Sequence, residues 1–160
     1  MRKVCIAILM LAALLVGQLS VFAAPDAIAV DTVGNSNDLI VVTKPKNQKD
    51  STFDSSYIVS GHGKEGTTVG FYLYSADDNA YKRILTEIQY IDTDGSVQKS
   101  KIPVEVKIGA SGLFINTISL SHGINDILIR AEKGENVQLM KLSITKYSYN
   151  LFDIIKSLTS

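Results

Sequence analysis

Two histidines are the first residues whose type and placement could support chemistry. His62 and His122 each lie beside glycine, in segments that we expect to be turns. If the two turns met at one end of the fold, the imidazoles could bind a metal ion, but two ligands are too few for a zinc site. No His-x-Glu, His-Glu-x-x-His or cysteine pattern accompanies either residue. We therefore predict two exposed loop histidines and no metal centre.

Aspartates form the second group of candidates. The segment Asp-Thr-Asp-Gly-Ser at 92–96 resembles the start of a calcium loop, with oxygen ligands two residues apart and a glycine behind them. Asp77 and Asp78 could add oxygens if both segments lay at one end of the fold. The rest of the loop, above all the terminal glutamate, is missing, and Asp94-Gly95 is typical of a hairpin turn. We favour the hairpin turn.

Nothing else in the chain points to catalysis. The nucleophile elbow Gly-x-Ser-x-Gly is absent, so we predict no catalytic residue, no cofactor and no enzyme activity. Exposed tyrosines are the better candidates for function, because aromatic rings on a sheet can stack on sugars or peptides. Tyr72 and Tyr74 have the parity opposite to Val69 and Phe71, so we expect both on the outer face of a strand. They are the predicted binding surface.

The elements that must position these residues are β-strands. Short runs rich in Val, Ile, Thr, Tyr and Phe recur between turn residues from position 39 onward, and no amphipathic helix interrupts them. Such a pattern predicts an all-β, antiparallel β-sandwich over residues 39–147. The expected strands are Leu39–Thr43, Ser56–Ser60, Thr68–Ser75, Tyr81–Ile91, Ile102–Ile108, Leu113–Leu120, Asp126–Glu132 and Val137–Thr145.

The two ends of the chain differ from this pattern. Residues 24–38 are small or polar without periodicity, which predicts a flexible linker. Residues 148–160 carry apolar side chains at helical spacing, which predicts a short amphipathic C-terminal helix or tail. Its apolar residues, Leu151, Phe152 and Ile155 among them, form a second candidate binding surface.

The first 23 residues predict export. Arg2 and Lys3 precede an uncharged apolar run, and Ala23 completes a small-residue cleavage site, as in a secretory signal peptide. The chain has 16 basic and 16 acidic residues, so loss of Arg2 and Lys3 leaves 14 against 16, a net charge of about −2. This balance argues against nucleic acid as a partner. We predict a secreted or cell-envelope protein without a transmembrane segment after cleavage.

Three local patterns resemble a bacterial immunoglobulin-like domain of secreted or cell-surface proteins. They are Val-Ser-Gly at 59–61 followed by Gly-Thr-Thr-Val at 66–69, Gly-Ala-Ser-Gly-Leu-Phe at 109–114, and Gly-Ile-Asn-Asp-Ile at 123–127. The resemblance covers about residues 39–146 and implies an immunoglobulin-like sandwich, a fold that hosts many roles. It lacks the cysteine pair and tryptophan of antibody domains.

We expect from this a non-catalytic interaction module at or near the bacterial envelope that binds a protein or an envelope glycan. The alternative is a structural or assembly subunit that associates through edge strands or the C-terminal helix. A secreted hydrolase is the least favoured reading.

Overall fold

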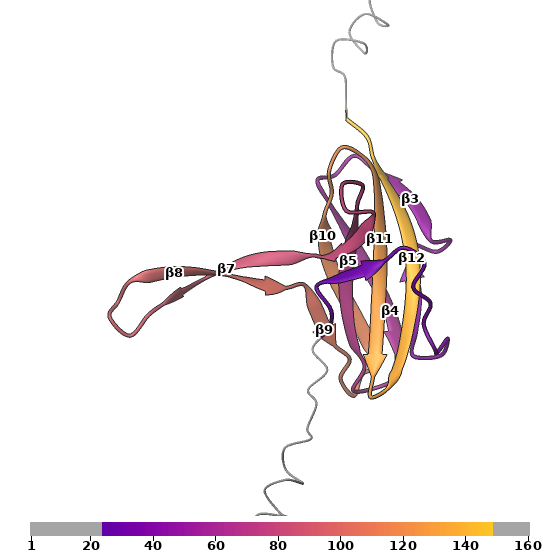
Figure 1. Ribbon diagram of the computed structural model, residues 1–160, viewed down its shortest axis with the longest axis horizontal. Helices are drawn as coiled ribbons and strands as arrows, with labels where there is room; N and C mark the ends of the chain where they lie inside the picture. The colour runs from indigo at the N-terminus through magenta and orange to yellow at the C-terminus, as the bar shows by residue number, and fades with distance from the viewer. Residues whose placement is uncertain (1–23, 149–160) are drawn as a thin grey trace, which may run out of the picture.

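The computed structural model describes residues 24–148, which form strands and no helix (Figure 1). The strands are β1 (Ala27–Ala29), β2 (Ile40–Lys44), β3 (Lys49–Thr52), β4 (Ser56–Gly63), β5 (Thr68–Ser75), β6 (Ala80–Arg83), β7 (Leu85–Ile91), β8 (Val97–Pro103), β9 (Glu105–Lys107), β10 (Leu113–Ser119), β11 (Gly123–Lys133) and β12 (Asn136–Lys146). The all-β prediction is confirmed. The predicted signal peptide, and residues 149–160 of the predicted terminal helix, lie outside the described residues.

Two sheets face each other across the core, as in a β-sandwich. The large sheet has the order β1-β6-β5-β11-β12-β3 with β9 beside β5, and the small sheet has the order β10-β4-β2. All pairs are antiparallel except β12 with β3. Alternate side chains of both sheets point inward and are almost completely buried. They include Val59, Val69, Phe71, Phe114, Ile118, Ile127, Ile129 and Ile144.

The segment 24–38 belongs to the folded body, where the sequence suggested a flexible linker. β1 pairs with β6 and places Ile28 opposite Tyr81. Ile28 packs with Tyr72 and Leu128 in a second buried cluster on the outer face of the large sheet. The Tyr72 hydroxyl also donates a hydrogen bond to the Pro25 carbonyl oxygen at 2.9 Å. These outward apolar side chains need a cover, and the N-terminal segment supplies it.

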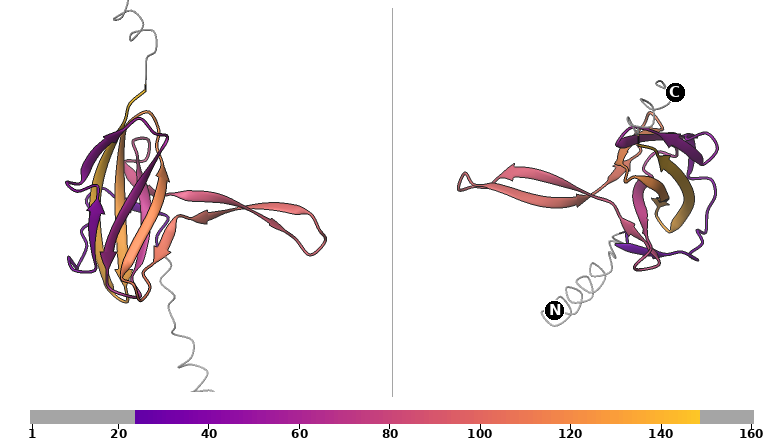
Figure 2. Two further views of the ribbon diagram at one scale, coloured as in Figure 1. Left: turned by 180° about the vertical axis from the view of Figure 1, so that it is seen from behind. Right: turned by 90° about the horizontal axis from the view of Figure 1, so that it is seen from above.

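A two-stranded hairpin leaves the sandwich between β6 and β9. We call it the arm, residues 85–103, and Figures 1 and 2 show it projecting away from both sheets. The sequence predicted one strand from Tyr81 to Ile91, but the structure divides this run between β6 and β7. After Ile84 the pairing partner changes from β5 to β8, so the chain leaves the large sheet. Every residue of β7 is exposed.

Candidate interaction surfaces

The two histidines do not form a joint site. His62 lies in β4 opposite Leu113, at the first residue of β10, whereas His122 follows the end of that strand. Since β10 has seven residues, about 20 Å of strand separates the two positions. His122 lies 3.1 Å from the Ser148 hydroxyl. The hypothesis that the imidazoles meet is wrong, because the strand places them at opposite ends of the sandwich.

The aspartate segments are also far apart. Residues 92–96 form the turn at the tip of the arm, where the Asp92 amide donates to the Ser96 carbonyl oxygen at 2.9 Å. Gly95 has a φ of 83°, which explains the glycine in this turn. Asp78 instead lies in the β5–β6 turn, where it accepts from Ser75 and pairs with Lys82 at 2.6 Å. Residues 24–148 contain no cluster of three metal-ligating side chains.

The predicted tyrosine surface is only partly available. Tyr72 does point outward from β5, but the N-terminal segment covers it and it is completely buried. Tyr74 is 36% exposed, and its hydroxyl donates to the Asn79 side-chain oxygen at 3.1 Å. Tyr72 is therefore not available to a partner, and of the two tyrosines Tyr74 alone stays a candidate. Leu151, Phe152 and Ile155 lie outside the described residues.

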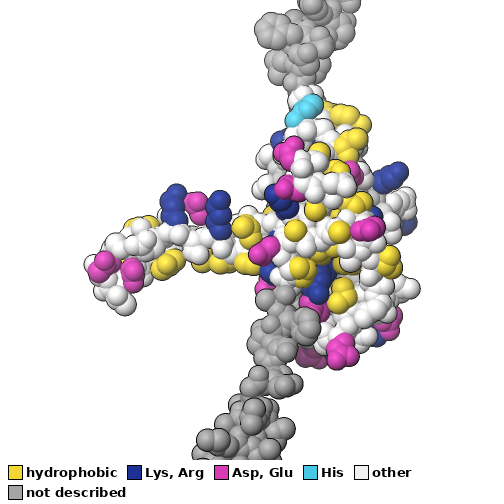
Figure 3. Space-filling view, in the orientation of Figure 1, with side chains coloured by type: hydrophobic (Ala, Val, Ile, Leu, Met, Phe, Trp, Pro, Cys, Tyr) yellow, Lys and Arg dark blue, Asp and Glu magenta, His cyan; other side chains and the backbone are white. Residues whose placement is uncertain are grey.

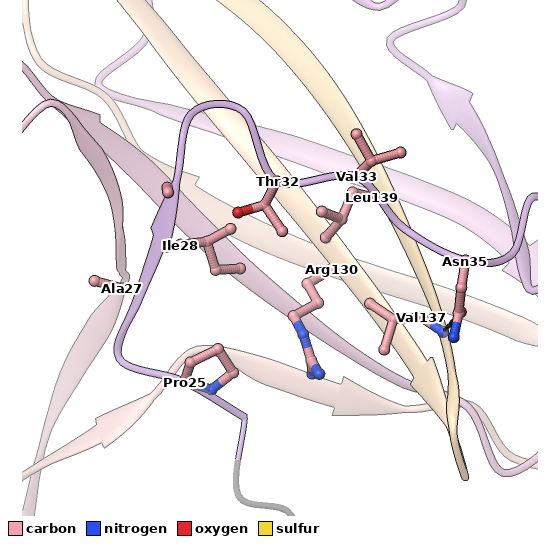
Figure 4. Close-up of a pocket in the computed structure, with 10 residues that line it drawn as sticks. Pro25, Ala27, Ile28, Thr32, Val33, Asn35, Arg130, Val137 and Leu139 are labelled. Carbon is pink, nitrogen blue, oxygen red and sulfur yellow. Dashed lines mark hydrogen bonds between the residues drawn. The ribbon is translucent and has the colours of Figure 1, made fainter.

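A hollow of about 380 Å³ lies beneath residues 25–35 on the outer face of the large sheet. In Figure 4 the Arg130 side chain lies among Pro25, Ile28 and Val137. Arg130 is the one ionisable residue that lines this hollow in the described part of the chain, and its guanidinium pairs with Glu132. General acid–base catalysis needs a positioned proton donor or acceptor, which a paired arginine does not supply.

The arm has two different faces, because paired residues of a hairpin point to the same side. Ile88 pairs with Ser100, Tyr90 with Gln98 and Thr86 with Ile102, so one face carries no charge. We call these six residues the neutral face of the arm. Tyr90 is 49% exposed and Ile102 is 40% exposed. The neutral face therefore leaves substantial apolar surface in water.

The opposite face of the arm carries charge. Glu87 pairs across the hairpin with Lys101 and lies 2.8 Å from the Lys99 ammonium group. Asp92 and Asp94 make the tip acidic. In Figure 3 charged side chains stand along one side of the arm, apolar ones along the other, and acidic ones at its end. The charged face also carries Leu85, Ile91 and Val97, so the two faces of the arm differ mainly in charge.

A second uncharged surface covers the outer face of the small sheet. Inward and outward positions alternate along β10, whose burial pattern places Leu113 and Ile115 outside and Phe114 in the core. We call this surface the small-sheet face. Lys44 pairs with Ser60 at its β2 edge, and the face otherwise carries no Asp, Glu, Lys or Arg. Its uncharged members are Val41, Thr43, Ser56, Ile58, Ser60, His62, Leu113, Ile115, Thr117 and Ser119. Leu113 and Ile115 are 65% and 64% exposed.

The sequence contained a signal for both surfaces. Leu113, Phe114 and Ile115 are successive apolar residues, so a strand there cannot bury all of them on one side. In the arm, Ile88 and Tyr90 lie at one parity and Leu85 and Ile91 at the other, so a strand there cannot bury all its apolar residues on one side either. Nothing local in either segment, however, says whether another layer covers the extra apolar side.

The small-sheet face ends at a corner of mixed charge, where Asp50 and Asp54 line one hollow together with Lys44. Lys44 ends β2, and Lys46 follows in the exposed turn to β3. The Lys44 ammonium group lies 5.4 Å from the Tyr57 ring centroid. Tyr57 donates a hydrogen bond to the Asp50 carboxylate at the same corner. Neither Lys44 nor Lys46 forms an ion pair among residues 24–148.

The hydrogen bond between Tyr57 and Asp50 shifts the pKa values of both side chains. The Tyr57 hydroxyl, and then the Ser51 amide, hold the pKa of Asp50 below its ordinary value of 3.8. Burial first, and the nearby carboxylate second, raise the pKa of Tyr57. The folded state therefore favours ionised Asp50. The ionised Asp50 carboxylate therefore stabilises the folded state at pH values above about 3.9, its pKa in the unfolded chain. This stabilisation is lost as the pH falls through the lower pKa of Asp50 in the folded protein.

We predict that Tyr57→Phe moves the pKa of Asp50 upward, towards 3.8, because the phenylalanine offers no hydroxyl to the carboxylate. The loss of stability between pH 6 and pH 3 should also become smaller. NMR titration of the Asp50 carboxyl group and urea unfolding at both pH values measure these effects. Tyr74→Phe is the matched control, because Tyr74 donates to an amide oxygen. An unchanged Asp50 pKa in Tyr57→Phe would contradict the prediction.

No helix within residues 24–148 is long and apolar enough to cross a membrane. No protein-family model matches the chain, and a search of curated proteins found no match.

Proposed function

We propose that this chain is a secreted, non-catalytic interaction module with an immunoglobulin-like fold that acts at or near a bacterial cell envelope. It binds a macromolecular partner through the neutral face of the arm and the small-sheet face. The observation that carries the proposal is the exposure of two uncharged apolar surfaces on one small sandwich. Export rests on the signal-like sequence of residues 1–23.

The strand pairing supports the immunoglobulin-like assignment. In that fold the first, second and fifth strands share one sheet, and the third, sixth and seventh share the other. Here β2, β4 and β10 form the small sheet, and β5, β11 and β12 are neighbours in the large one. The arm occupies the connection between the two groups, where related sandwiches vary in the number of strands.

The exposed surfaces favour binding over catalysis. The neutral face leaves Tyr90 at 49% and Ile102 at 40% exposure, and the small-sheet face carries no carboxylate. A hairpin of two strands is only marginally stable by itself in water. The arm therefore gains most if a partner covers its neutral face, which supports a role in assembly.

Sedimentation with isolated bacterial envelopes tests the proposal. We expect the protein of residues 24–160 to sediment with envelope preparations, and Ile88→Asp and Ile115→Asp to reduce the bound fraction at least threefold, because each places a carboxylate on an apolar contact surface. Asn136→Asp is the control, because it adds the same charge at the exposed first residue of β12, away from both surfaces. Equal sedimentation of all four proteins, or none above an unrelated sandwich protein, would sink the proposal.

Export has its own test. When the full chain is produced in a bacterium with a secretion system, we expect the protein outside the cytoplasm to begin at Ala24. N-terminal sequencing measures this directly. Retention of the intact chain in the cytoplasm would contradict the secreted part of the proposal.

A further inference from the structure

We infer that the partner of these two surfaces is a second copy of this chain: the arm of each copy lies along the small-sheet face of the other. This inference rests on the proposed function and names the partner. A pair of copies meets the envelope with two modules at once, so a variant that prevents pairing also lowers the bound fraction. Two-fold pairs of identical chains use the same patches reciprocally, so each copy would give one arm and receive one. The geometry of one chain supports this arrangement at three points.

The first point is size. The strands of the arm pair over seven residues, from Leu85 with Pro103 to Ile91 with Val97. The small sheet also pairs over seven residues, from Leu113 with His62 to Ser119 with Ser56. Both surfaces are therefore about 20 Å long, and two strands of the arm fit within the width of three.

The second point is reach. Both surfaces belong to one chain, but the arm projects away from the sandwich in all three views of Figures 1 and 2. The neutral face therefore cannot lie on the small sheet of its own copy. Contact between the two surfaces requires two molecules. Stacking of one arm on another would instead leave both small-sheet faces in water.

The third point is charge. The neutral face ends at a tip with Asp92 and Asp94, and the small-sheet face ends at a corner where Lys44 and Lys46 form no ion pair among residues 24–148, although Asp50 and Asp54 line a hollow beside Lys44. An arm laid along the sheet with its tip at Lys44 and Lys46 gives these two lysines carboxylate partners at the rim, while the uncharged parts of the two surfaces meet in the middle. Such a division is typical of protein interfaces. Asp50 at the corner already accepts a hydrogen bond from Tyr57.

Residues 149–160 are the other candidate cover for the small-sheet face. They are twelve residues, and as a helix they would be about 18 Å long, enough to cover one surface. They would leave the neutral face of the arm exposed, whereas a second copy covers both. The acidic tip and the lysine corner also have no role in that arrangement. We therefore favour the second copy.

Light scattering and sedimentation equilibrium over a concentration range test the inference with the protein of residues 24–160. We expect the mass to rise from monomer to dimer, and Ile88→Asp to raise the dimer Kd at least tenfold. Gln89→Asp adds the same charge one residue away on the charged face and should change the Kd less than threefold. A monomeric wild type, or equal effects of both variants, overturns the inference.

Mixing two variants separates this arrangement from other dimers. Ile88→Asp damages the arm and Ile115→Asp damages the small-sheet face, so each homodimer has a defect in both contacts. The mixed dimer keeps one intact contact, and we expect it to form more tightly than either homodimer. If the mixture associates no better than its components, or if Ile115→Asp leaves the Kd unchanged, the arm does not lie on the small sheet.

Charge reversal tests the orientation. Asp92→Lys with Asp94→Lys, and Lys44→Asp with Lys46→Asp, should each weaken the dimer about threefold to tenfold at low salt, and their combination should restore it. Failure of the combination to recover any affinity contradicts contact between tip and corner. Circular dichroism confirms that each variant is folded.

Two outcomes distinguish the inference from the proposed function. If the wild type stays monomeric but Ile88→Asp still loses envelope binding, the inference fails and the interaction module stands. If truncation after Ser148 makes a monomeric wild type self-associate, the C-terminal segment covers the small-sheet face and the inference is also overturned. If neither association nor envelope binding occurs, both proposals fail.

Discussion

Replacing Gln138 with leucine is expected to lower the free energy of unfolding by about 3 kcal/mol or more. Gln138 lies on β12 in the large sheet and is 6% exposed. Its side-chain oxygen accepts hydrogen bonds from the amides of Leu39 and Ile40, at 2.8 and 2.9 Å. Its amide nitrogen donates to the Ile40 carbonyl oxygen at 3.0 Å. One side chain thus satisfies three backbone groups at the start of β2, in the opposite sheet.

The large expected effect follows from burial. Leucine fills a similar volume but offers no polar atom, so three backbone groups near the core lose their partners. Each unsatisfied buried group costs about 1–3 kcal/mol. Typical domains are stable by only about 5–15 kcal/mol, so the variant should lose a large part of its stability. β2 forms one edge of the small sheet, and its attachment should loosen first.

Urea unfolding measures the loss, and hydrogen exchange locates it. We expect the amides of Leu39 and Ile40 to exchange faster in Gln138→Leu than in the wild type. Gln89→Leu is the matched control, because Gln89 is exposed on the arm, and its stability should change by less than about 0.5 kcal/mol. Equal stability of the two variants, with unchanged protection at β2, would show that the side chain does not hold β2 to the large sheet.

The body of the sandwich could be predicted from local patterns. Thr68–Ser75 is the same range in the prediction and in β5, and the predicted strands from Leu113 to Thr145 overlap β10, β11 and β12. Alternation predicted inward positions for Phe71 and Ile129, and both are completely buried. Period-two patterning is strong in these strands because one face of each lies against the core.

What could not be predicted depends on contacts between distant residues. Ile28 is one apolar residue in a polar segment, and its burial depends on Tyr72 and Leu128, which lie far along the chain. An apolar residue at an outward position has the same local pattern whether a segment covers it or water does. This is why Tyr72 looked like a binding residue from sequence and is instead part of a second core.

The arm is a second feature that local sequence patterns could not predict. The run from Tyr81 to Ile91 reads as one strand because nothing breaks it at Ile84. The Ile84 amide donates to the Phe71 carbonyl oxygen at 2.9 Å, while its own carbonyl oxygen accepts from the Val104 amide at 2.8 Å. Ile84 therefore marks the change from the sheet to the hairpin. Only the pairing partners, which are not encoded locally, separate the two parts.

The second large effect is expected at Gly61, in the central strand of the small sheet. Gly61 pairs with Phe114 on one side and Val42 on the other. A Cβ atom there would lie 2.2 Å from the Val41 carbonyl oxygen and 2.7 Å from the Phe114 ring. No real Cβ atom approaches a backbone oxygen so closely, so the strands would have to separate. We expect Gly61→Ala to cost about 3 kcal/mol, the upper end of the range for overpacking.

Gly109→Ala is the matched control, with the same change of composition and the opposite expected sign. A Cβ at Gly109 meets no atom within 4 Å, and alanine restricts the unfolded chain, so this variant should be neutral or up to about 1 kcal/mol more stable. Thermal and urea unfolding of both proteins measure the difference. Because the Val41 carbonyl is backbone, Phe114→Leu should not restore Gly61→Ala completely. If Gly61→Ala were as stable as Gly109→Ala, β4 would not lie as close to β2 as the small-sheet face requires.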